Sequence, residues 1–171
     1  MRRVLIYVLL IVLLDGCKKE PVFYGSRVDI YLLKSFTYSI DRTTSPATNV
    51  ITGAVLEDAP LVANQSITSY TQSTATFTLR NDVWPIIRNF GTDKAFAVTV
   101  DDQPIYYGVF HPAYLSSITF GLAIIIPELA IGRELQIDFP SIDGNSFLQQ
   151  LDKRNDSRII NALRATSRLH Y

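Results

Sequence analysis

The sequence predicts an α+β fold: a single domain with a mainly antiparallel sheet of five to seven strands and two short helices. Three observations carry this prediction. Runs in which apolar and polar residues alternate recur along the chain, two stretches place apolar residues three and four apart, and strand-forming residues such as Thr, Val, Ile, Tyr and Phe are plentiful. The expected domain covers residues 27–171, which is the usual size for one domain.

Alternating patterns predict the strands. They occur at Arg27–Leu33, Val50–Leu56, Thr74–Leu79 and Glu134–Phe139. The clearest element is a hairpin, with strands at Lys94–Val100 and Pro104–Phe110 around a tight acidic turn at Asp101–Gln103. Gly121–Ile126 is a continuous apolar run, which predicts a central strand buried on both faces. Ser35–Asn49 is rich in Ser and Thr and predicts a loop or a poorly paired hairpin.

Capping residues mark the two helices. Asn81 or Asp82 is expected to cap a short helix that runs to Phe90, with Pro85 in its first turn. Asn155 or Asp156 is expected to cap a C-terminal helix that reaches about Leu169 and buries Ile159, Ile160 and Leu163. Leu61–Tyr70 is expected to hold one helical turn followed by a loop.

The first residues have the pattern of an export signal. Arg2 and Arg3 precede an unbroken apolar run, Val4–Leu14, and Asp15, Gly16 and Cys17 follow it. Spanning a bilayer takes about 20 apolar residues in a helix, so this run fits a cleaved secretory signal better than a permanent anchor. The sequence therefore predicts a signal peptide at residues 1–16. The simplest alternative is an ordinary secretory signal in which Cys17 is incidental.

This end of the chain resembles bacterial lipoproteins, whose signal ends in a lipobox. Leu14, Gly16 and Cys17 match the lipobox, while Asp15 stands where a small neutral residue is usual. The resemblance implies that Cys17 is lipidated and becomes the new N-terminus, so that residues 17–26 form a lipidated tether. Lys18, Lys19 and Glu20 are similar to the start of the surface-export tag of Bacteroidota lipoproteins. The implied location is the cell envelope, lipid-anchored at the outer membrane, on its periplasmic side or at the cell surface.

A second resemblance covers roughly Leu61–Ile126. The segment Thr92–Ile105, TDKAFAVTVDDQPI, resembles the extracytoplasmic head subdomain of the SecD export proteins through its lysine, its apolar strand and its acidic turn. Asp102 stands in place of the turn glycine of that family. The resemblance implies an α+β sheet that faces polypeptide. As a whole, the sequence resembles small Bacteroidota lipoproteins of unknown function.

Several kinds of chemistry have no signature here. Acidic and basic residues balance, 16 of each, so the chain carries no nucleic-acid footprint. Cys17 is the single cysteine, which leaves the domain without a disulfide or a cysteine metal site. The phosphate-binding loop, the dinucleotide fingerprint and the HExxH motif are absent from the sequence, and we expect no cofactor, no metal and no catalytic residue. Glu57 and Asp58 are read as a charged loop, and Asp101 with Asp102 as a turn.

Two surfaces are candidates for binding. Tyr106, Phe110, Tyr114 and Phe120 crowd the hairpin and the loop after it, and we expect Tyr106 and Phe110 to share an outer face while Tyr107 packs inward. Exposed rings there would suit a polypeptide or a polysaccharide. The alternative is that these rings fill the core. The second surface is a C-terminal basic set, read as a solvated helix face or as a contact for anionic headgroups; it comprises Lys153, Arg154, Arg158, Arg164 and Arg168.

These observations favour a non-enzymatic, lipid-anchored module of the cell envelope that binds a macromolecule. The sequence leaves its oligomeric state open. One alternative is an envelope hydrolase that uses His111 with Ser116 or Ser117 and Asp101, because these residues could spell a Ser, His and Asp triad. The other is a structural envelope component without a dedicated ligand.

Overall fold

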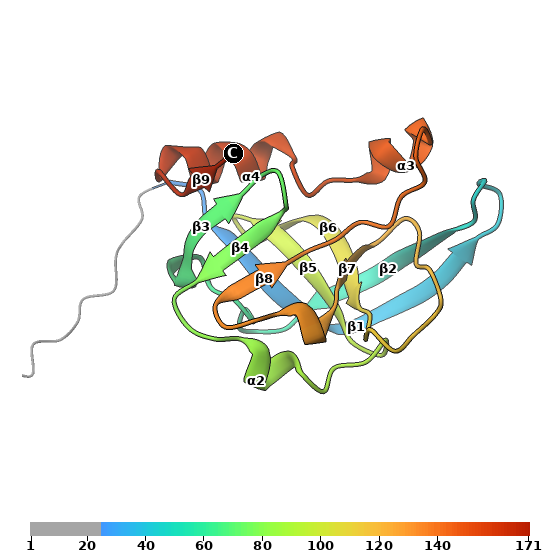
Figure 1. Cartoon of the computed structure of the whole chain (residues 1–171), viewed down its shortest axis with the longest axis horizontal. Coiled ribbons are helices and arrows are strands. Elements are labelled where there is room, and N and C mark those ends of the chain that lie inside the picture. Colours follow the sequence, from blue (N-terminus) through green and yellow to red (C-terminus); the bar gives the residue numbers. More distant parts are fainter. Residues whose placement is uncertain (1–24) are drawn as a thin grey trace, which may run out of the picture.

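The computed structural model describes residues 25–171, so the expected signal peptide, Cys17 and most of the tether lie outside the described residues. It confirms the α+β class. Short helices accompany two sheets, one of five strands and one of four (Figure 1). In the part of the chain from Gly25 onward, every helix is too short or too polar to cross a bilayer.

The larger sheet has the order β2-β1-β5-β6-β7. Its strands are β1 (Val28–Asp41), β2 (Thr48–Leu56), β5 (Ala95–Val100), β6 (Gln103–Phe110) and β7 (Ala123–Ile125). All neighbours are antiparallel except β6 and β7, which are parallel. The predicted hairpin is confirmed as β5 and β6. Asp101 and Asp102 form its turn with φ angles of 50° and 63°, a left-handed geometry that Asp tolerates and tight hairpins favour.

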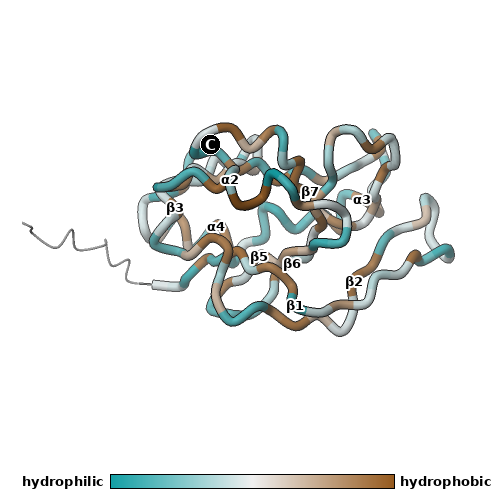
Figure 2. Tube along the Cα trace, turned by 90° about the horizontal axis from the view of Figure 1, so that it is seen from below, coloured by the Kyte–Doolittle hydropathy of each residue, from teal (hydrophilic) through white to brown (hydrophobic). Residues whose placement is uncertain are grey.

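The β1 strand is longer than the alternating pattern predicted and pairs with two different strands along its length. Its first part, Val28–Leu32, pairs with β5, and its outer part pairs with β2 from Leu33 to Asp41. Register shifts between Leu33 and Thr37 mark the change. Of the two options predicted for Ser35–Asn49, the loop is wrong and the hairpin is confirmed, because β1 and β2 pair across this segment with register shifts near its base. We call Ser35–Asp41 together with β2 the arm, which projects from the body in Figures 1 and 2.

The β7 strand is buried as predicted but is not central. It forms the last strand of its sheet, and its outer side is covered by an isolated bridge in which Ile124 and Asp138 exchange two backbone hydrogen bonds of 2.8 Å. The continuous apolar run Gly121–Ile126 therefore predicts that the strand is buried on both faces, but it does not predict where the strand lies in the sheet.

The smaller sheet has the order β8-β4-β3-β9. Its strands are β3 (Ile67–Thr71), β4 (Thr76–Leu79), β8 (Glu134–Gln136) and β9 (Leu169–His170). The expected helical turn exists as the 3-10 helix η1 (Asn64–Ser66). The loop expected after it is wrong, because this segment is β3, held between β4 and the end of the chain, β9.

The helices are short and mostly begin where capping residues predicted. In α2 (Trp84–Ile87) the backbone N–H of Trp84 donates to Asp82 over 2.9 Å, and Pro85 lies in the first turn. The α4 helix (Ser157–Ala165) is capped by Asp156 and buries Ile159, Ile160 and Leu163 as expected, but it ends before β9 instead of reaching Leu169. Two elements were not predicted: α3 (Ser146–Leu151), capped by Asn145, and the 3-10 helix η2 (Pro127–Leu129).

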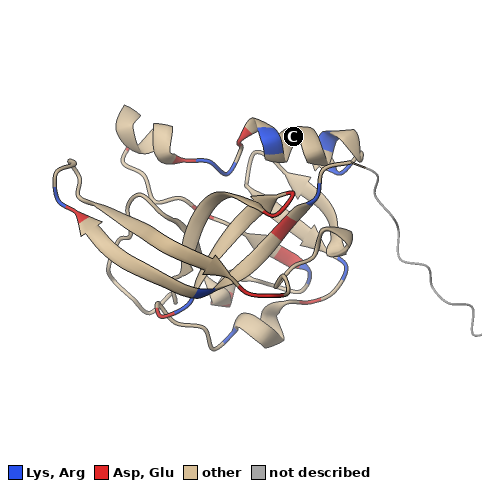
Figure 3. Cartoon of the chain, turned by 180° about the vertical axis from the view of Figure 1, so that it is seen from behind, with Lys and Arg blue, Asp and Glu red and all other residues tan. Residues whose placement is uncertain are grey.

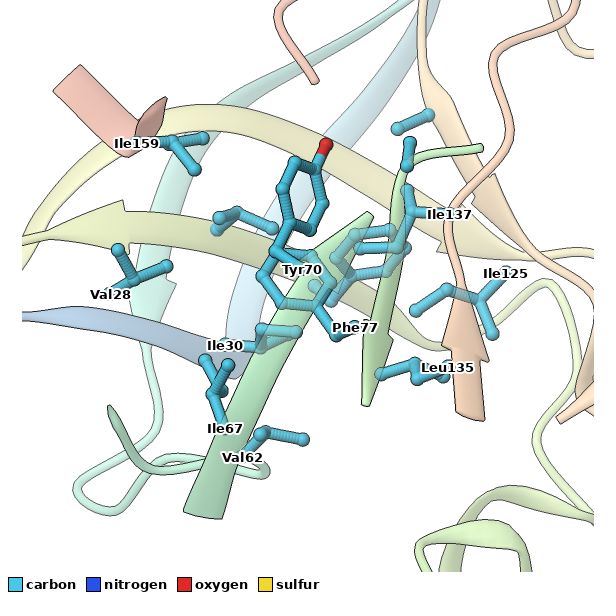
Figure 4. Packing of buried hydrophobic residues seen from close by; sticks show 14 of the residues in the cluster. Val28, Ile30, Val62, Ile67, Tyr70, Phe77, Ile125, Leu135, Ile137 and Ile159 are labelled. Carbon is cyan, nitrogen blue, oxygen red and sulfur yellow. The ribbon is translucent and has the colours of Figure 1, made fainter. Parts of the chain in front are cut away.

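Two clusters of buried residues form the core. The main cluster lies between the two sheets and under α4, where the rings of Tyr70 and Phe77 pack at a tilt of 46° with centroids 4.6 Å apart (Figure 4). The second cluster lies on the opposite face of the larger sheet, where Ile51 of the arm covers Ala97 and Val109 of the β5–β6 hairpin. Both faces of that hairpin are therefore covered.

A buried polar contact joins the two ends of the domain. Arg168 is 2% exposed, and its guanidinium donates to the carbonyl and side-chain oxygens of Asn64 over 2.7 and 2.8 Å. The backbone N–H of Asn64 donates in turn to Asp29 over 2.7 Å. Burial raises the pKa of Asp29. The expectation that Arg168 lies on a solvated helix face is wrong, because the helix ends at Ala165 and the chain turns inward at Ser167, whose φ is 57°.

Candidate functional site

A groove lies between the arm and α3. Its cavity has a volume of about 470 Å³, in the range of natural small-molecule sites. One side is the start of β2, the floor is β6 with the residues that lead into β7, and the other side is α3 with the segment that follows it (Figure 1).

The walls of the groove are largely apolar. The residues that give it this character are Val50, Ile51, Ile105, Tyr107, Leu122, Phe139, Phe147 and Leu151. Phe147 remains 37% exposed at the edge of the groove, although it is an aromatic residue on a helix that covers the body. A half-exposed aromatic ring beside an apolar cavity offers a surface for an apolar ligand.

The groove has polar ends of opposite character. Asp41 and Thr44 lie at the end formed by the arm, and Lys153 and Arg154 lie at the end that follows α3. Arg154 is held by Asp152, with N–H to oxygen distances of 2.7 to 3.2 Å, and donates to the carbonyl of Ile137. Lys153 is exposed and forms no ion pair with any described residue, so its ammonium is available to a ligand.

The floor contains a tyrosine whose hydroxyl has no partner. Tyr106 is 8% exposed, and its hydroxyl makes no hydrogen bond to the part of the chain from Gly25 onward. Burial raises the pKa of this hydroxyl well above its usual value, so it stays protonated. Its neighbour Tyr70 donates a hydrogen bond of 2.9 Å to the carbonyl of Arg154.

A close contact ties the arm to the floor. The backbone and side-chain N–H groups of Asn49 both donate to the carbonyl of Phe120, over 2.7 and 3.0 Å. Gly121 follows with a φ of +87°, and a Cβ there would lie 2.8 Å from Cβ of Thr48. Glycine is therefore needed at the point where the arm meets the residues that lead into β7.

The outer, exposed face predicted for Tyr106 and Phe110 is wrong, and the alternative, in which these rings fill the core, is confirmed for both. Both are buried in the main cluster, whereas Tyr107 lies on the other face, half-buried against the second cluster. Alternation shows which residues share a face, but the second sheet and α4 decide which face is inside. Tyr114 is 79% exposed on the loop after β6, and Phe120 is half-buried beside β2. The four residues do not form one surface.

The residues of the hypothetical triad lie apart. His111 is 8% exposed, its backbone N–H donates to Ile125, and its Nδ1 has no partner among the described residues. Asp101 lies at the opposite end of β6, where it accepts a hydrogen bond of 2.8 Å from the backbone of Arg27. That bond lowers the pKa of Asp101. Ser116 and Ser117 are exposed on the loop.

Two of the acidic residues singled out in the sequence, Asp58 and Asp102, contact neighbouring side chains of β1. Asp102 pairs with Arg27 and accepts from the hydroxyl of Tyr31 over 3.2 Å, so the acidic turn is anchored to β1. Asp58 lies 3.9 Å from Lys34, and Glu57 is exposed. Within residues 25–171 there is no group of three or more His, Cys, Asp or Glu residues placed to hold a metal ion.

The C-terminal basic set does not form a continuous cationic face. Arg158 pairs with Asp156 over 2.8 Å and Arg164 donates to Asn161, while Arg168 is buried. In Figure 3, acidic and basic segments lie next to one another along this C-terminal part of the chain. Lys153, at the end of the groove, forms no ion pair with a described residue, and Arg164 contacts a neutral amide rather than a carboxylate.

Comparisons of the chain with family models, with curated proteins and with solved structures found no significant match. The resemblances to bacterial lipoproteins and to the SecD head therefore stay predictions.

Proposed function

We propose that this chain is a lipid-anchored protein of the cell envelope that binds a small amphipathic anion in the groove between the arm and α3, without covalent chemistry. The observation that carries the proposal is the apolar groove with an exposed ammonium at one end, that of Lys153, which forms no ion pair with a described residue. An apolar body would lie against Phe147 and Leu151, and a carboxylate, phosphate or sulfonate would reach Lys153.

This ligand class replaces the macromolecule expected from the sequence. Stacking of a polysaccharide or polypeptide on Tyr106 and Phe110 requires exposed rings, and both rings are buried. The groove offers apolar walls on three sides instead, which suits a compact ligand such as an acyl chain with an acidic head.

Binding can be measured with 1-anilinonaphthalene-8-sulfonate, an apolar ring system with one negative charge, and with dodecanoate as a competitor. We expect saturable binding of one probe per chain and displacement by dodecanoate. Leu151→Trp fills the groove and should weaken binding at least about tenfold, since it removes about 1.4 kcal/mol or more of binding free energy. Leu129→Trp is the matched control, because Leu129 also ends a short helix but lies outside the groove and is 51% exposed.

Lys153→Ala should weaken binding of the anion severalfold and reduce its dependence on salt, because the ammonium is a partly screened, exposed charge. Binding that is unsaturable, or that Leu151→Trp and Leu129→Trp weaken equally, would contradict the proposal.

Lipid anchoring at Cys17 is tested separately, by mass spectrometry of the native protein. We expect Cys17 at the N-terminus with acyl groups attached, and Cys17→Ser to release the protein from the membrane fraction. A chain that still carries residues 1–16 and an unmodified Cys17 would contradict lipid anchoring without affecting the groove.

A further inference from the structure

The outer part of β1 has a neighbouring strand on one side only. Over Val28–Leu32 the strand pairs with β5, but this pairing ends where Leu32 lies opposite Phe96. From Thr37 to Asp41 the described partner is β2. The arm therefore carries an edge of β1 that projects beyond the body of the sheet (Figure 1).

The hydrogen bonds of the arm show which groups face this edge. The backbone N–H of Asn49 points away from β1, because it donates to Phe120 over 2.7 Å. Asn49 lies opposite Ile40, and Ile51 lies opposite Tyr38. Since pairs alternate in an antiparallel ladder, both are non-hydrogen-bonded pairs, and the N–H and C=O groups of Tyr38 and Ile40 point away from β2. None of these groups has a backbone partner within residues 25–171.

The outer half of this edge carries little protection against pairing. Ser35–Ile40 contains no proline and no charged residue, and the register shifts of β1 lie nearer the body, between Leu33 and Thr37, so Tyr38 and Ile40 belong to the regular part of the edge. The side chains of Tyr38 and Ile40 are 46% and 52% exposed. The outer edge of β2 differs, because Phe120 occupies its start and Gly53, with a φ of +59°, interrupts it.

We propose that this edge of β1 pairs antiparallel with the same edge of a second copy, forming a two-fold symmetric dimer whose two arms make one four-stranded sheet. The symmetry places the residue at the axis opposite itself. An axis at Tyr38 pairs the two copies of Tyr38 and brings Phe36 opposite Ile40 in both directions. Three apolar pairs then meet on one face with no charge among them.

Neighbouring registers are less favourable. An axis at Thr37 would bring Lys34 opposite Ile40, and an axis at Ser39 would bring Phe36 opposite Arg42. The register centred on Tyr38 keeps every charged side chain away from the apolar pairs, and the one like-charge pair that it creates, Lys34 opposite Arg42, lies past the end of β1 at Asp41. This inference does not depend on the groove or on lipidation.

Sedimentation equilibrium of the full chain carrying Cys17→Ser tests the dimer. We expect a monomer and dimer in equilibrium, with a dissociation constant tighter than about 1 mM. Ile40→Lys should weaken the dimer at least about tenfold, because lysine at an open edge opposes strand pairing. Val55→Lys is the matched control, since Val55 is 51% exposed on the other strand of the arm and should leave the constant unchanged.

A cysteine tests the register. In a hydrogen-bonded pair the two Cα atoms lie about 5.5 Å apart, within the span of a disulfide. Tyr38→Cys in the same Cys17→Ser background should therefore form a covalent dimer on mild oxidation much faster than Val55→Cys. A chain that stays monomeric at about 1 mM, a dimer that Ile40→Lys leaves intact or that Val55→Lys weakens equally, or equal rates of crosslinking would each overturn the proposal. The proposal would also be overturned if the chain stays monomeric and this edge of β1 pairs with an unrelated extended peptide.

Discussion

Two of the antiparallel hairpins in the described residues, the β5–β6 hairpin and the arm, differ strongly in how the rest of the fold surrounds them. Every residue of β5 is buried, and the β5–β6 hairpin is flanked by β1 on one side and β7 on the other. The arm, by contrast, covers the body with Ile51 on one face while Tyr38, Ile40 and Val55 stay exposed. The comparison shows that a segment can pair as a strand in either place, whereas the strands and helices packed around it decide whether its side chains are buried.

The largest expected effect is in the buried hairpin. A Cβ at Gly108 would lie 2.3 Å from Cζ of Phe96 and 2.5 Å from the carbonyl oxygen of Ala123, and both strands are fixed by neighbours. Gly108→Ala should therefore lower the free energy of unfolding by about 3 kcal/mol or more. Urea denaturation measures the change.

Thr52→Ala, at an exposed position in the arm, is the counterpart and should cost under about 1 kcal/mol. Equal losses for the two variants would break the distinction between the buried hairpin and the arm.

The next effect concerns the contact between the two regions. Gly121→Ala imposes a side chain at a φ of +87° and against Thr48, so we expect a loss of about 2 kcal/mol and faster hydrogen exchange at the amide of Asn49. Gly132→Ala is the control: its φ is +63° with open space around it, which leaves only backbone strain of about 1 kcal/mol. If exchange at Asn49 is unchanged in Gly121→Ala, the arm is held by other contacts.

The smallest effect concerns α4, which covers the body but not the arm. The Arg158 side chain hydrogen-bonds to Asp156 and lowers the pKa of that carboxyl to about 2. A lowered pKa contributes stability above the unfolded value of about 3.9, and the contribution is lost as pH falls from about 4 toward 2. Asp156→Asn keeps a capping oxygen, so it should cost about 1 kcal/mol at pH 7.

Chemical denaturation at pH 7 and near pH 2 measures this dependence, and the difference between Asp156→Asn and the unaltered chain should nearly vanish at the lower pH. Asp143→Asn, on an exposed loop, should change stability by under about 0.5 kcal/mol at both values. A difference that persists near pH 2 would show that the cap rather than the ion pair is responsible.

Sequence patterns predict the elements that carry their own signals. The β5–β6 hairpin has alternation and an acidic turn, and α4 has a cap and an apolar face, so both were found within a few residues. β3 was missed because Ser and Thr match a loop, and its pairing with β4 and with β9, which is remote in the sequence, makes it a strand. For the outer part of β1, the composition allows a loop as well as a hairpin, and pairing with β2 decides between them.

The groove could not be predicted for the same reason. Its walls come from β2, β6 and α3, and Lys153 is distinguished only by the absence of an ion pair with the described residues around it. The burial of Tyr106 and Phe110 depends on the second sheet, which no local pattern reveals. Asn145 before Ser146 is a capping signal that could have identified α3, because its side chain accepts from Leu148 over 3.0 Å.

The contact between Arg168 and Asn64 joins residues separated by 104 positions in the sequence. Because Arg168 reaches Asn64 only when β9 has paired with β3, the polar interior between Asp29 and Asn64 is completed by the docking of the C-terminal segment. Removing residues 168–171 would therefore leave the buried oxygens of Asn64 without their guanidinium donor, at a cost of a few kcal/mol, roughly that of an unsatisfied buried polar group.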